Sequence, residues 1–541
     1  MTTHGGDARN NAEREPVPQD WLPGLVENWR SDVVSGFIIF LIALPLSLGI
    51  ALASGAPPIA GVITAIIGGM LVSLLSGSYV TINGPAAGLI VIVLGAITAL
   101  GQGDPAAGYR LALAVGVVAG AIQIILGLVK AGRMTNFFPL SVVHGMLAGI
   151  GVIIMARQLP VALGVEETHH VIPEEWPVLH GLDSILTIPQ SILNLSPIVA
   201  LVGVVSILIM VLWPYWTRIA RIIPAPLVAA AAGIGLAAFS GLGPQFLLDL
   251  PPSLLAGITF PDFSQIYTPT SIRWIVAFVF VASLESLLTA SAIDKLDPFK
   301  RRSNMNREFL GKGAGNMLSS MIGGLPMIAE VVRSSANIFN GAKTRWSNFF
   351  HGAFILLFVA LVPGVLEMIP LAALAGILIV IGFRLAHPKE FVHASHIGRE
   401  ELLFMVVTMI IVVVEDLLVG VILGVVVGLV VAVVRGTSIG NLFRPSMEVS
   451  EDSDGTTVVK FRRALGFGNF VGVRGKLDEL PQGKKVVLDF SEAHFVDHTV
   501  VERLEDWEAE YVRDGGEVER RGLDHLHHAT HNPLSALVKS A

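Results

Sequence analysis

Long apolar runs, separated by short charged clusters, constrain this chain more than any other feature of its sequence. Of the 541 residues, 53% are hydrophobic and only 15% are charged, whereas soluble domains carry about 25% charged residues. Runs of about 20 apolar residues can cross a bilayer as helices. The pattern predicts a tail over residues 1–30, a transmembrane domain over 31–440 and a small soluble domain over 447–541.

Fourteen segments are candidate spans, roughly 33–54, 57–76, 85–101, 107–130, 135–158, 197–216, 222–243, 271–293, 309–323, 326–340, 347–362, 366–385, 400–416 and 417–436. Lys and Arg gather in alternate loops, with Arg110 as an exception, and none occurs between Arg157 and Arg218. Because positive loops stay inside, this predicts fourteen spans with both termini cytoplasmic, in a bacterial inner membrane. Glu415-Asp416, at an outside boundary, is expected to be a solvated turn.

Two of these spans are short and begin with a break. One opens with Gly84-Pro85 and the other with Gly323-Gly324-Leu325-Pro326. Proline fits the first turn of a helix, so each is expected to start inside the membrane after extended backbone. Pro85 and Pro326 lie 241 positions apart, which suggests a seven-plus-seven inverted repeat with a transport site at the breaks.

The two helix starts can form a receptor for a small anion. Free N–H groups at a helix start carry about half a positive charge, and two facing starts attract an anion. Ala86, Ala87 and Gly88 have small side chains that leave the backbone accessible, and Arg333 could add a full positive charge. The alternative is that Gly-Pro only kinks the helices.

Intramembrane acids are the second signal. Ionised carboxylates are costly in a bilayer and are functional candidates there. Glu285 lies within an apolar span with Thr289 one turn later on the same face. Glu330 lies early in the second interrupted span, three residues before Arg333. The alternatives are a helix–helix hydrogen bond for Glu285 and a buried ion pair between Glu330 and Arg333.

Four segments together resemble the sulfate permease (SulP) family: IALPLSLGIALASGAPPIAG (42–61), INGPAAG (82–88), VASLESLLTASAID (281–294) and GGLPMIAEVVRSSANIFNGAKTR (323–345). The resemblance implies an all-α, fourteen-span fold shared with uracil permeases, in which a core domain carries the site and a gate domain flanks it. It also implies a homodimer and a C-terminal STAS domain. The sequence around Glu330 is most similar to that of the SulP branch that is often linked to carbonic anhydrase, and therefore to bicarbonate.

The resemblance also implies roles for single residues. The acid of the eighth span falls on Glu285, the hydroxyl for a coupling sodium ion on Thr289, and the basic residue of the tenth span on Arg333. Glu330 is a second candidate for coupling. The candidate substrate contacts are Ser47, Pro85, Ala86, Ala87, Gly88, Ile328, Ala329, Glu330 and Arg333.

The soluble tail resembles a STAS domain of α/β type. Strands are expected at Thr457–Phe461, Phe470–Val473 and Val486–Phe490, and a helix at Thr499–Arg513. Asp497 precedes this helix and is expected to cap it.

The sequence therefore predicts a secondary transporter of a small inorganic anion that works by alternating access. Bicarbonate is favoured, sulfate is close behind, and symport with sodium or protons is expected. The alternatives are a nucleobase or dicarboxylate transporter on the same fold, and a membrane sensor or scaffold acting through the tail. The chain has no cysteine, and its soluble part has no nucleophile–base set or metal triad. No enzyme, cofactor, nucleic-acid partner or metal, beyond sodium at Glu285 and Thr289, is therefore expected.

Overall fold

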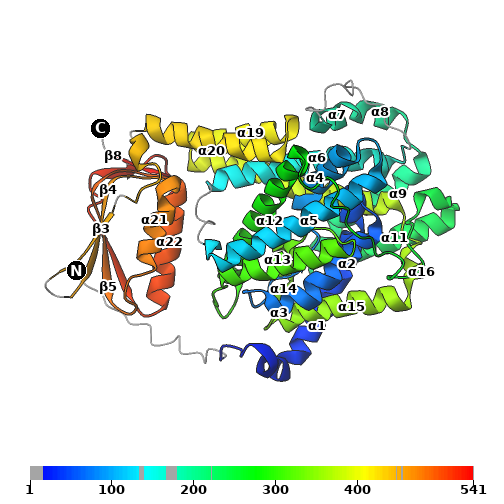
Figure 1. Cartoon of the computed structure of the whole chain (residues 1–541), viewed down its shortest axis with the longest axis horizontal. Helices are drawn as coiled ribbons and strands as arrows, with labels where there is room; N and C mark the ends of the chain where they lie inside the picture. The colour runs from blue at the N-terminus through cyan, green and yellow to red at the C-terminus, as the bar shows by residue number, and fades with distance from the viewer. Residues whose placement is uncertain are drawn as a thin grey trace.

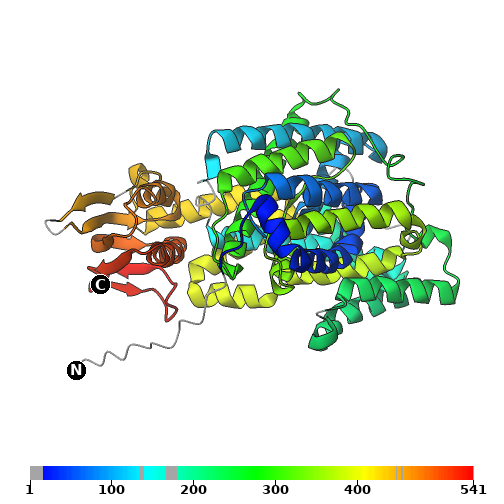
Figure 2. The ribbon, with the colours of Figure 1, turned by 90° about the horizontal axis from the view of Figure 1, so that it is seen from below.

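The computed structural model describes residues 16–132, 139–165, 180–220, 222–435, 437–445, 447–452 and 455–539. Helices form one large body, and a small sheet domain lies at one end of it (Figure 1). The perpendicular view separates the same two parts (Figure 2). The expected combination of a helical membrane protein with a small C-terminal α/β domain is confirmed.

Each of the fourteen expected segments corresponds to a helix or a run of helices. Within the described ranges, eight helical stretches are long and apolar enough to cross a membrane. The helices of the first half are α1 (Trp21–Ala53), α2 (Pro58–Ile67) continued by a π-helical turn (Gly68–Val72) and α3 (Ser73–Leu75), α4 (Ile90–Gly101), α5 (Pro105–Leu128), α6 (Leu140–Leu163), α9 (Pro197–Leu212) and α11 (Ala225–Ser240). Those of the second half are α12 (Pro269–Leu296), α13 (Met305–Met321), α14 (Val331–Phe339), α15 (Trp346–Leu361), α17 (Leu371–Leu385), α19 (Arg399–Val414) and α20 (Leu417–Val434).

Short helices lie between these segments. They are α7 (His180–Leu186), α8 (Ile188–Leu193), α10 (Thr217–Ala220), α16 (Pro363–Leu366) and α18 (Pro388–Ile397).

The long helices pack in two groups. We call the first the site group, in which α5 packs against α13 and α12, and α1 against α2 and α15. In the second, the flanking group, α6 packs against α17 and α19, α9 against α11 and α17, and α19 against α20. Each group draws helices from both halves of the chain, so segments far apart in sequence share one core.

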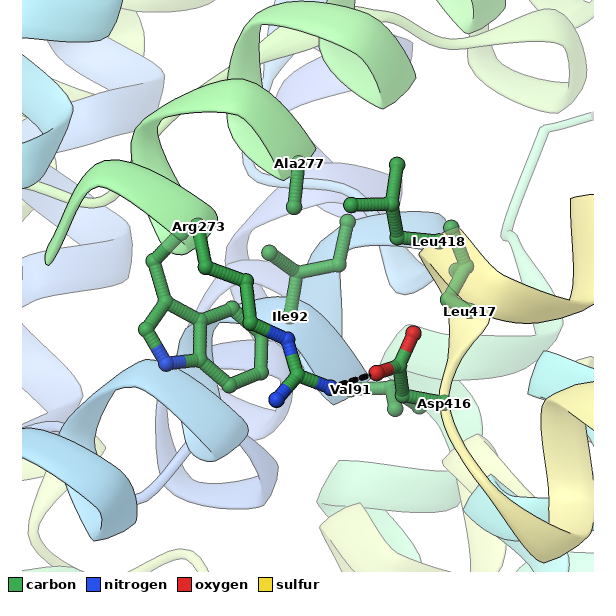
Figure 3. Close-up of a pocket in the computed structure, with 8 residues that line it drawn as sticks. Val91, Ile92, Arg273, Ala277, Asp416, Leu417 and Leu418 are labelled. Carbon is green, nitrogen blue, oxygen red and sulfur yellow. Dashed lines mark hydrogen bonds and ion pairs between the residues drawn. The ribbon is translucent and has the colours of Figure 1, made fainter. Parts of the chain in front are cut away.

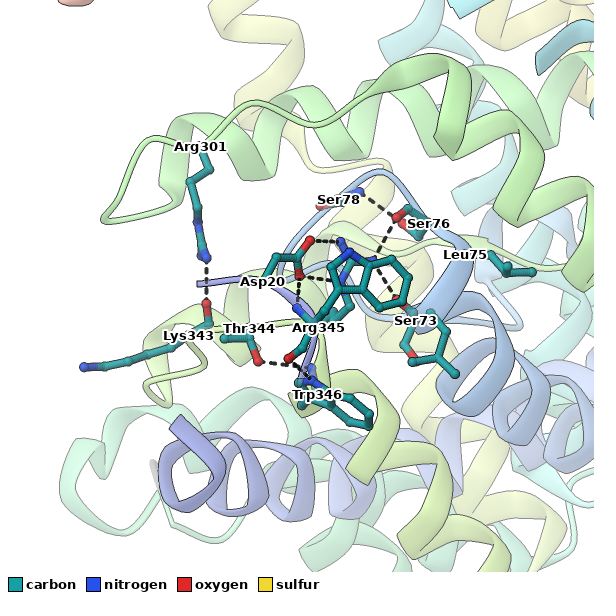
Figure 4. A network of polar contacts seen from close by, with 12 residues as sticks. Asp20, Ser73, Leu75, Ser76, Ser78, Arg301, Lys343, Thr344, Arg345 and Trp346 are labelled. Carbon is teal, nitrogen blue, oxygen red and sulfur yellow. Dashed lines mark hydrogen bonds and ion pairs between the residues drawn. The ribbon is translucent and has the colours of Figure 1, made fainter. Parts of the chain in front are cut away.

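Helix α1 begins at Trp21 and so includes residues 21–30, which the sequence assigned to the tail. The Asp20 carboxylate accepts a hydrogen bond from the Trp21 N–H at 2.9 Å, and this cap starts the helix early. Asp20 also pairs with the buried Arg345 at 2.7 Å. Arg345 in turn donates to the carbonyls of Ser73 and Ser76 at 2.9 Å (Figure 4). These contacts therefore hold the start of α1 against the end of α3.

The C-terminal domain is one six-stranded sheet with two helices. The strands run in the order β3-β4-β5-β8-β7, with β6 beside β5. The elements are β3 (Met447–Glu451), β4 (Thr457–Leu465), α21 (Phe467–Leu477), β5 (Lys485–Val496), α22 (His498–Arg513), β6 (Glu517–Arg521), β7 (Leu526–His528) and β8 (Leu537–Lys539).

One of the strands predicted in this domain does not form. Residues Phe470–Val473 lie inside helix α21, where Phe467, Phe470, Val473 and Leu477 are all buried. These positions recur at helical spacing, which a four-residue apolar run does not reveal. The expected cap is confirmed: Asp497 accepts from the Thr499 N–H at 2.7 Å at the start of α22. Burial of this carboxyl raises its pKa.

Ion pairs hold the C-terminal domain against the end of α12. Lys295 lies 2.8 Å from Asp506, and Arg302 lies 3.3 Å from Glu510 and 3.2 Å from Asp514. All three acids belong to α22 or follow it directly. The same helix α12 carries Glu285 further back along its length, so the tail contacts the helix that bears the principal intramembrane acid.

Candidate functional site

The two chain breaks meet. Residues Asn83–Gly84 (β1) pair antiparallel with Ile328–Ala329 (β2), with Asn83 opposite Ala329 and Gly84 opposite Ile328. The Glu330 N–H extends the pairing by donating to the Ile82 carbonyl at 3.0 Å. The predicted meeting of the two helix starts is confirmed.

The helix starts differ slightly from the expectation. Ala86 and Glu330 are the extended N-cap residues, and the first start enters α4 through a 3-10 turn over Ala87–Leu89. The second start was expected at Pro326 but lies at Val331. A helix cannot begin at Pro326 because Ile328 and Ala329, directly after it, are held in extended backbone by pairing with β1.

Side chains of other helices bind the backbone of the second break. Thr64 Oγ1 accepts from the Leu325 N–H at 2.6 Å, and Asn316 Oδ1 accepts from the Met327 N–H at 2.6 Å. The Tyr109 hydroxyl donates to the Gly323 carbonyl. Unpaired backbone groups are costly away from water, so these contacts make an extended segment tolerable within a helical bundle.

The first break is supported in the same way. Ser334 Oγ accepts from the Ile82 N–H at 2.9 Å, and Asn337 Nδ2 donates to the Val80 carbonyl at 2.9 Å. Both supporting residues lie on α14, the helix that follows the second break. Each break is therefore held partly by the other.

A buried ion pair that the sequence analysis missed lies beside the first break. Lys312 Nζ is 2.8 Å from Glu308 Oε2, and both side chains are almost fully buried. Lys312 also donates to the Asn83 side-chain carbonyl, and Glu308 accepts from the Ser78 N–H at 2.7 Å. The signal for this pair was a lysine inside a candidate span with a glutamate four residues earlier, at the start of that span.

Arg333 joins the two breaks. It is fully buried, its Nε lies 2.8 Å from Glu330 Oε2, and its Nη2 donates to the Pro85 carbonyl at 2.7 Å. Of the two interpretations of Glu330 and Arg333, the structure shows the ion pair. Among the described residues, Arg333 Nη1 has no hydrogen-bond partner. A Cβ on Gly84 would lie 2.9 Å from this nitrogen, so the unpaired N–H groups face the first break.

The Glu330 carboxylate spans the gap between the starts. It is the N-cap residue of α14, yet its side chain does not cap that helix. Instead the carboxylate lies close to the Ala87 N–H at the start that leads into α4. A carboxylate of the protein thus lies where the geometry favours a negative charge.

Glu285 lies against the same 3-10 turn. A Cβ on Gly88 would be 2.2 Å from both carboxyl oxygens of Glu285, so only glycine allows this approach. Glu285 Oε1 is buried and has no hydrogen-bond partner among the residues described. Thr289, one turn later on α12, is also buried. Between them, Ser286 Oγ accepts from the Ala329 N–H at 3.4 Å, a contact that the sequence did not predict.

The other candidate contacts are all buried. Pro85, Ala86, Ala87, Ile328 and Ala329 belong to the paired breaks or the first helix start. Ser47 lies in α1, where its backbone carbonyl touches Gly61 of α2. Its buried hydroxyl has no hydrogen-bond partner in the described part of the chain.

A polar link connects the two packing groups. Arg273, near the start of α12, pairs with Asp416, whose carboxylate also accepts from the Val419 N–H at 2.8 Å and caps α20. The pair borders a small cavity of about 20 Å³ whose wall includes Val91, Ile92 and Ala277 (Figure 3). In the expected turn, Glu415 is exposed and the Asp416 side chain is 19% exposed. The sequence did not predict the ion pair with Arg273, because this partner lies 143 residues away.

With this geometry established, the comparisons with known proteins decide the family. The sulfate permease family model matches residues 29–408. The chain belongs to the sulfate permease family. It is 28% identical over 437 residues to the bicarbonate transporter BicA of Picosynechococcus sp., covering 79% of this chain and 74% of that protein. It is 25% identical over 483 residues to YvdB of Bacillus subtilis, a protein named provisionally as a sulfate transporter. This match covers 87% of each chain.

Solved structures agree with the fold of this family member. The transmembrane domain of a cyanobacterial BicA superposes with a TM-score of 0.63 at 26% identity, covering 74% of this chain and 97% of that one. The murine anion transporter Slc26a9 in its inward-facing state gives a TM-score of 0.66 at 15% identity, covering 91% and 85%. The chain is accordingly a membrane-spanning anion transporter of a family that consists of transporters and not enzymes.

Proposed function

We propose that this sulfate permease family member carries a small inorganic anion across the membrane by alternating access, with the anion bound between the starts of α4 and α14. One observation carries the proposal. Strands β1 and β2 pair, so the N–H groups of Ala87 and Val331, which follow these strands by a few residues, belong to helix starts that begin at the same place. Arg333 already pairs with the Glu330 carboxylate there, and the Ala87 N–H lies close to it. A group of donors that holds one carboxylate has the chemistry to hold another small oxyanion.

Bicarbonate is the favoured substrate and sulfate the next. The relatives named above support both substrates. BicA is a bicarbonate transporter, and YvdB is named provisionally as a sulfate transporter. Ala86, Ala87 and Ala329 offer no hydrogen-bonding side chain, which disfavours a nucleobase. A sensor or scaffold would not need buried acids beside a pair of helix starts.

Cation coupling follows from the charge of Glu285. A second negative charge near the bound anion opposes binding, by roughly 3 kcal/mol at 5 Å and an effective dielectric of about 20. A sodium ion between Glu285 and Thr289, or a proton on Glu285, removes this repulsion. Anion and cation then favour each other's binding, which is the thermodynamic basis of symport.

The two packing groups fit the core and gate domains of an alternating-access carrier. In this proposal fourteen spans form a seven-plus-seven inverted repeat, and both termini face the cytoplasm of a bacterial cell. The site group moves against the flanking group and carries the anion with it. Assembly as a homodimer and association with a carbonic anhydrase complete the proposal.

Uptake into proteoliposomes tests the function. The purified chain is reconstituted, and labelled bicarbonate and labelled sulfate are offered in parallel under an imposed sodium gradient, a proton gradient or neither. We expect gradient-driven accumulation of one anion, with empty liposomes as the control. Failure to accumulate either anion under both gradients would overturn the proposal of coupled anion transport.

A further inference from the structure

A cavity lies where the last helix of the flanking group leads into the C-terminal domain. Its volume is about 210 Å³, and its lining residues are Thr437, Ser438, Asn441, Arg463, Ala464 and His494. Three of these residues belong to the linker after α20, and the others to strands β4 and β5. The space is open to the surface, since Ser438, Arg463 and His494 are exposed, and its volume is enough for a small ligand.

An irregularity in the sheet turns two basic side chains toward the cavity. Arg463 pairs with Ala493 and the next residue, Ala464, pairs with Phe495, so His494 is an extra residue in β5. Such bulges bend a strand and redirect its side chains. Arg463 and His494 both line the cavity as a result.

Arg463 occupies a strained backbone conformation. Its φ is +63°, a region that L residues other than Asn and Asp rarely adopt. Strain of this kind is typical of functional positions. In the part of the chain that the structure describes, no ion pair or hydrogen bond engages the Arg463 side chain. The adjacent Arg462, by contrast, pairs with Glu448 at 2.6 Å and with Glu492 at 3.2 Å.

The cavity is rich in donors and lacks acids. Thr437 Oγ1 is buried, with the residue 3% exposed, and it has no hydrogen-bond partner among the described residues. A buried hydroxyl without a partner costs free energy that a bound ligand would recover. No Asp or Glu occurs among the described residues that line the cavity. A guanidinium, an imidazole, two hydroxyls and an amide are the groups that bind oxyanions.

We propose that this cavity binds a phosphate-type oxyanion, either free phosphate or the headgroup of an anionic lipid, separate from the transport site. A bound oxyanion would bridge the linker residues Thr437 and Asn441 to Arg463 of the sheet. It would stiffen the connection between α20 and the C-terminal domain. Free phosphate and an anionic lipid headgroup present the same kind of oxyanion. The cavity lies directly after α20, a helix that leaves the membrane.

Hydrogen–deuterium exchange on the full chain tests the proposal. In one arm, inorganic phosphate is titrated onto protein in a zwitterionic detergent. In the other, phosphate-free nanodiscs of phosphatidylglycerol are compared with nanodiscs of phosphatidylcholine. We expect slower exchange in peptides spanning 437–441 and 490–496. Protection by phosphate identifies a free oxyanion, and protection by phosphatidylglycerol alone identifies a lipid.

Two neighbouring arginines provide matched variants. Arg463→Asn suits the positive φ and removes the guanidinium, so it should weaken the protecting ligand at least about tenfold. Arg462→Asn removes a charge of the same sign one residue away and should leave the affinity unchanged. Thr437→Val is a second probe that keeps the shape of the side chain, and it should also weaken binding.

Three results would overturn the proposal. The first is no protection in either arm. The second is equal weakening by Arg463→Asn and Arg462→Asn, which indicates a general charge effect. The third applies if Arg463→Asn does not fold: an unchanged affinity in Thr437→Val then counts against the site.

Discussion

The two chain breaks correspond in the fold but differ in chemistry. Each break is extended, pairs with the other and leads into a helix. The start at Ala86-Ala87-Gly88 has no ionisable side chain, whereas the start at Glu330 carries a carboxylate and, three residues later, a guanidinium. Both breaks have a buried ion pair beside them, Lys312–Glu308 at the first and Arg333–Glu330 at the second. The fold thus places two equivalent helix starts, and side chains make one of them the charged partner.

The largest expected effect comes from breaking the ion pair of the second break. Arg333→Gln leaves Glu330 as a buried carboxylate without its cation, which costs about 3–5 kcal/mol. We expect a large drop in thermal stability in detergent and loss of anion uptake in proteoliposomes. An unchanged unfolding temperature would show that the pair contributes little to the fold.

Double variants separate stability from transport. Glu330→Gln with Arg333→Gln removes both charges and should regain most of the stability but not the transport, because the guanidinium is then missing from the proposed site. Glu308→Gln with Lys312→Gln is the matched control at the first break, and it should regain both. If the two double variants transport equally well, the breaks do not differ in the way proposed.

Adding one methyl group to the uncharged start should have the next largest effect. Gly88→Ala places a Cβ 2.2 Å from both Glu285 carboxyl oxygens. These oxygens end a flexible side chain that can move aside, so we expect little loss of stability. We expect uptake to fall at least about tenfold because Glu285 is displaced. Gly235→Ala on α11 is the control, since nothing lies within 4 Å of its added Cβ. Equal uptake by both variants would contradict a role for this contact.

Neutralising Glu285 should remove coupling while sparing the fold. Glu285 Oε1 has no hydrogen-bond partner within the described ranges, so Glu285→Gln loses no partner and the unfolding temperature should stay the same or rise. Gradient-driven accumulation should disappear, and anion exchange should persist in part. Wild-type dependence on sodium or pH in this variant would shift the coupling role to Glu330.

The smallest effect is expected at the link between the packing groups. The Arg273 side chain is 56% exposed, and an exposed pair contributes at most about 1 kcal/mol. Asp416→Asn should therefore change the unfolding free energy little. It should change the transport rate a few-fold, because the link must break if the groups move apart at this end. Arg273→Gln should have the same effect on rate, and an unchanged rate in both variants would exclude the link from the transport cycle.

The sequence predicted the positions of the breaks because Gly and Pro act through local backbone preferences. It could not predict which side chains bind the broken backbone. Thr64 and Leu325 are 261 residues apart, and Lys312 and Asn83 are 229 apart. Such partners are fixed only when the two halves of the chain pack together.

The candidate site was predicted better in composition than in arrangement. Glu285, Glu330 and Arg333 were identified because ionisable groups are rare in apolar spans. The sequence left open whether Arg333 would pair with Glu330, since spacing allows the pair but does not require it. The prediction of a strand at Phe470–Val473 was wrong for a different reason. A short apolar run has no measurable period.

The position of the Glu330 carboxylate beside the Ala87 N–H has a consequence for the affinity of the proposed anion site. A tethered carboxylate competes for the donors at a fixed effective concentration that dilution does not lower. At the proposed site an incoming anion therefore exchanges with a resident carboxylate instead of entering a vacant receptor. The apparent dissociation constant equals the intrinsic constant divided by the fraction of time that the donors are free of Glu330. Such internal competition weakens retention of the anion, which favours turnover.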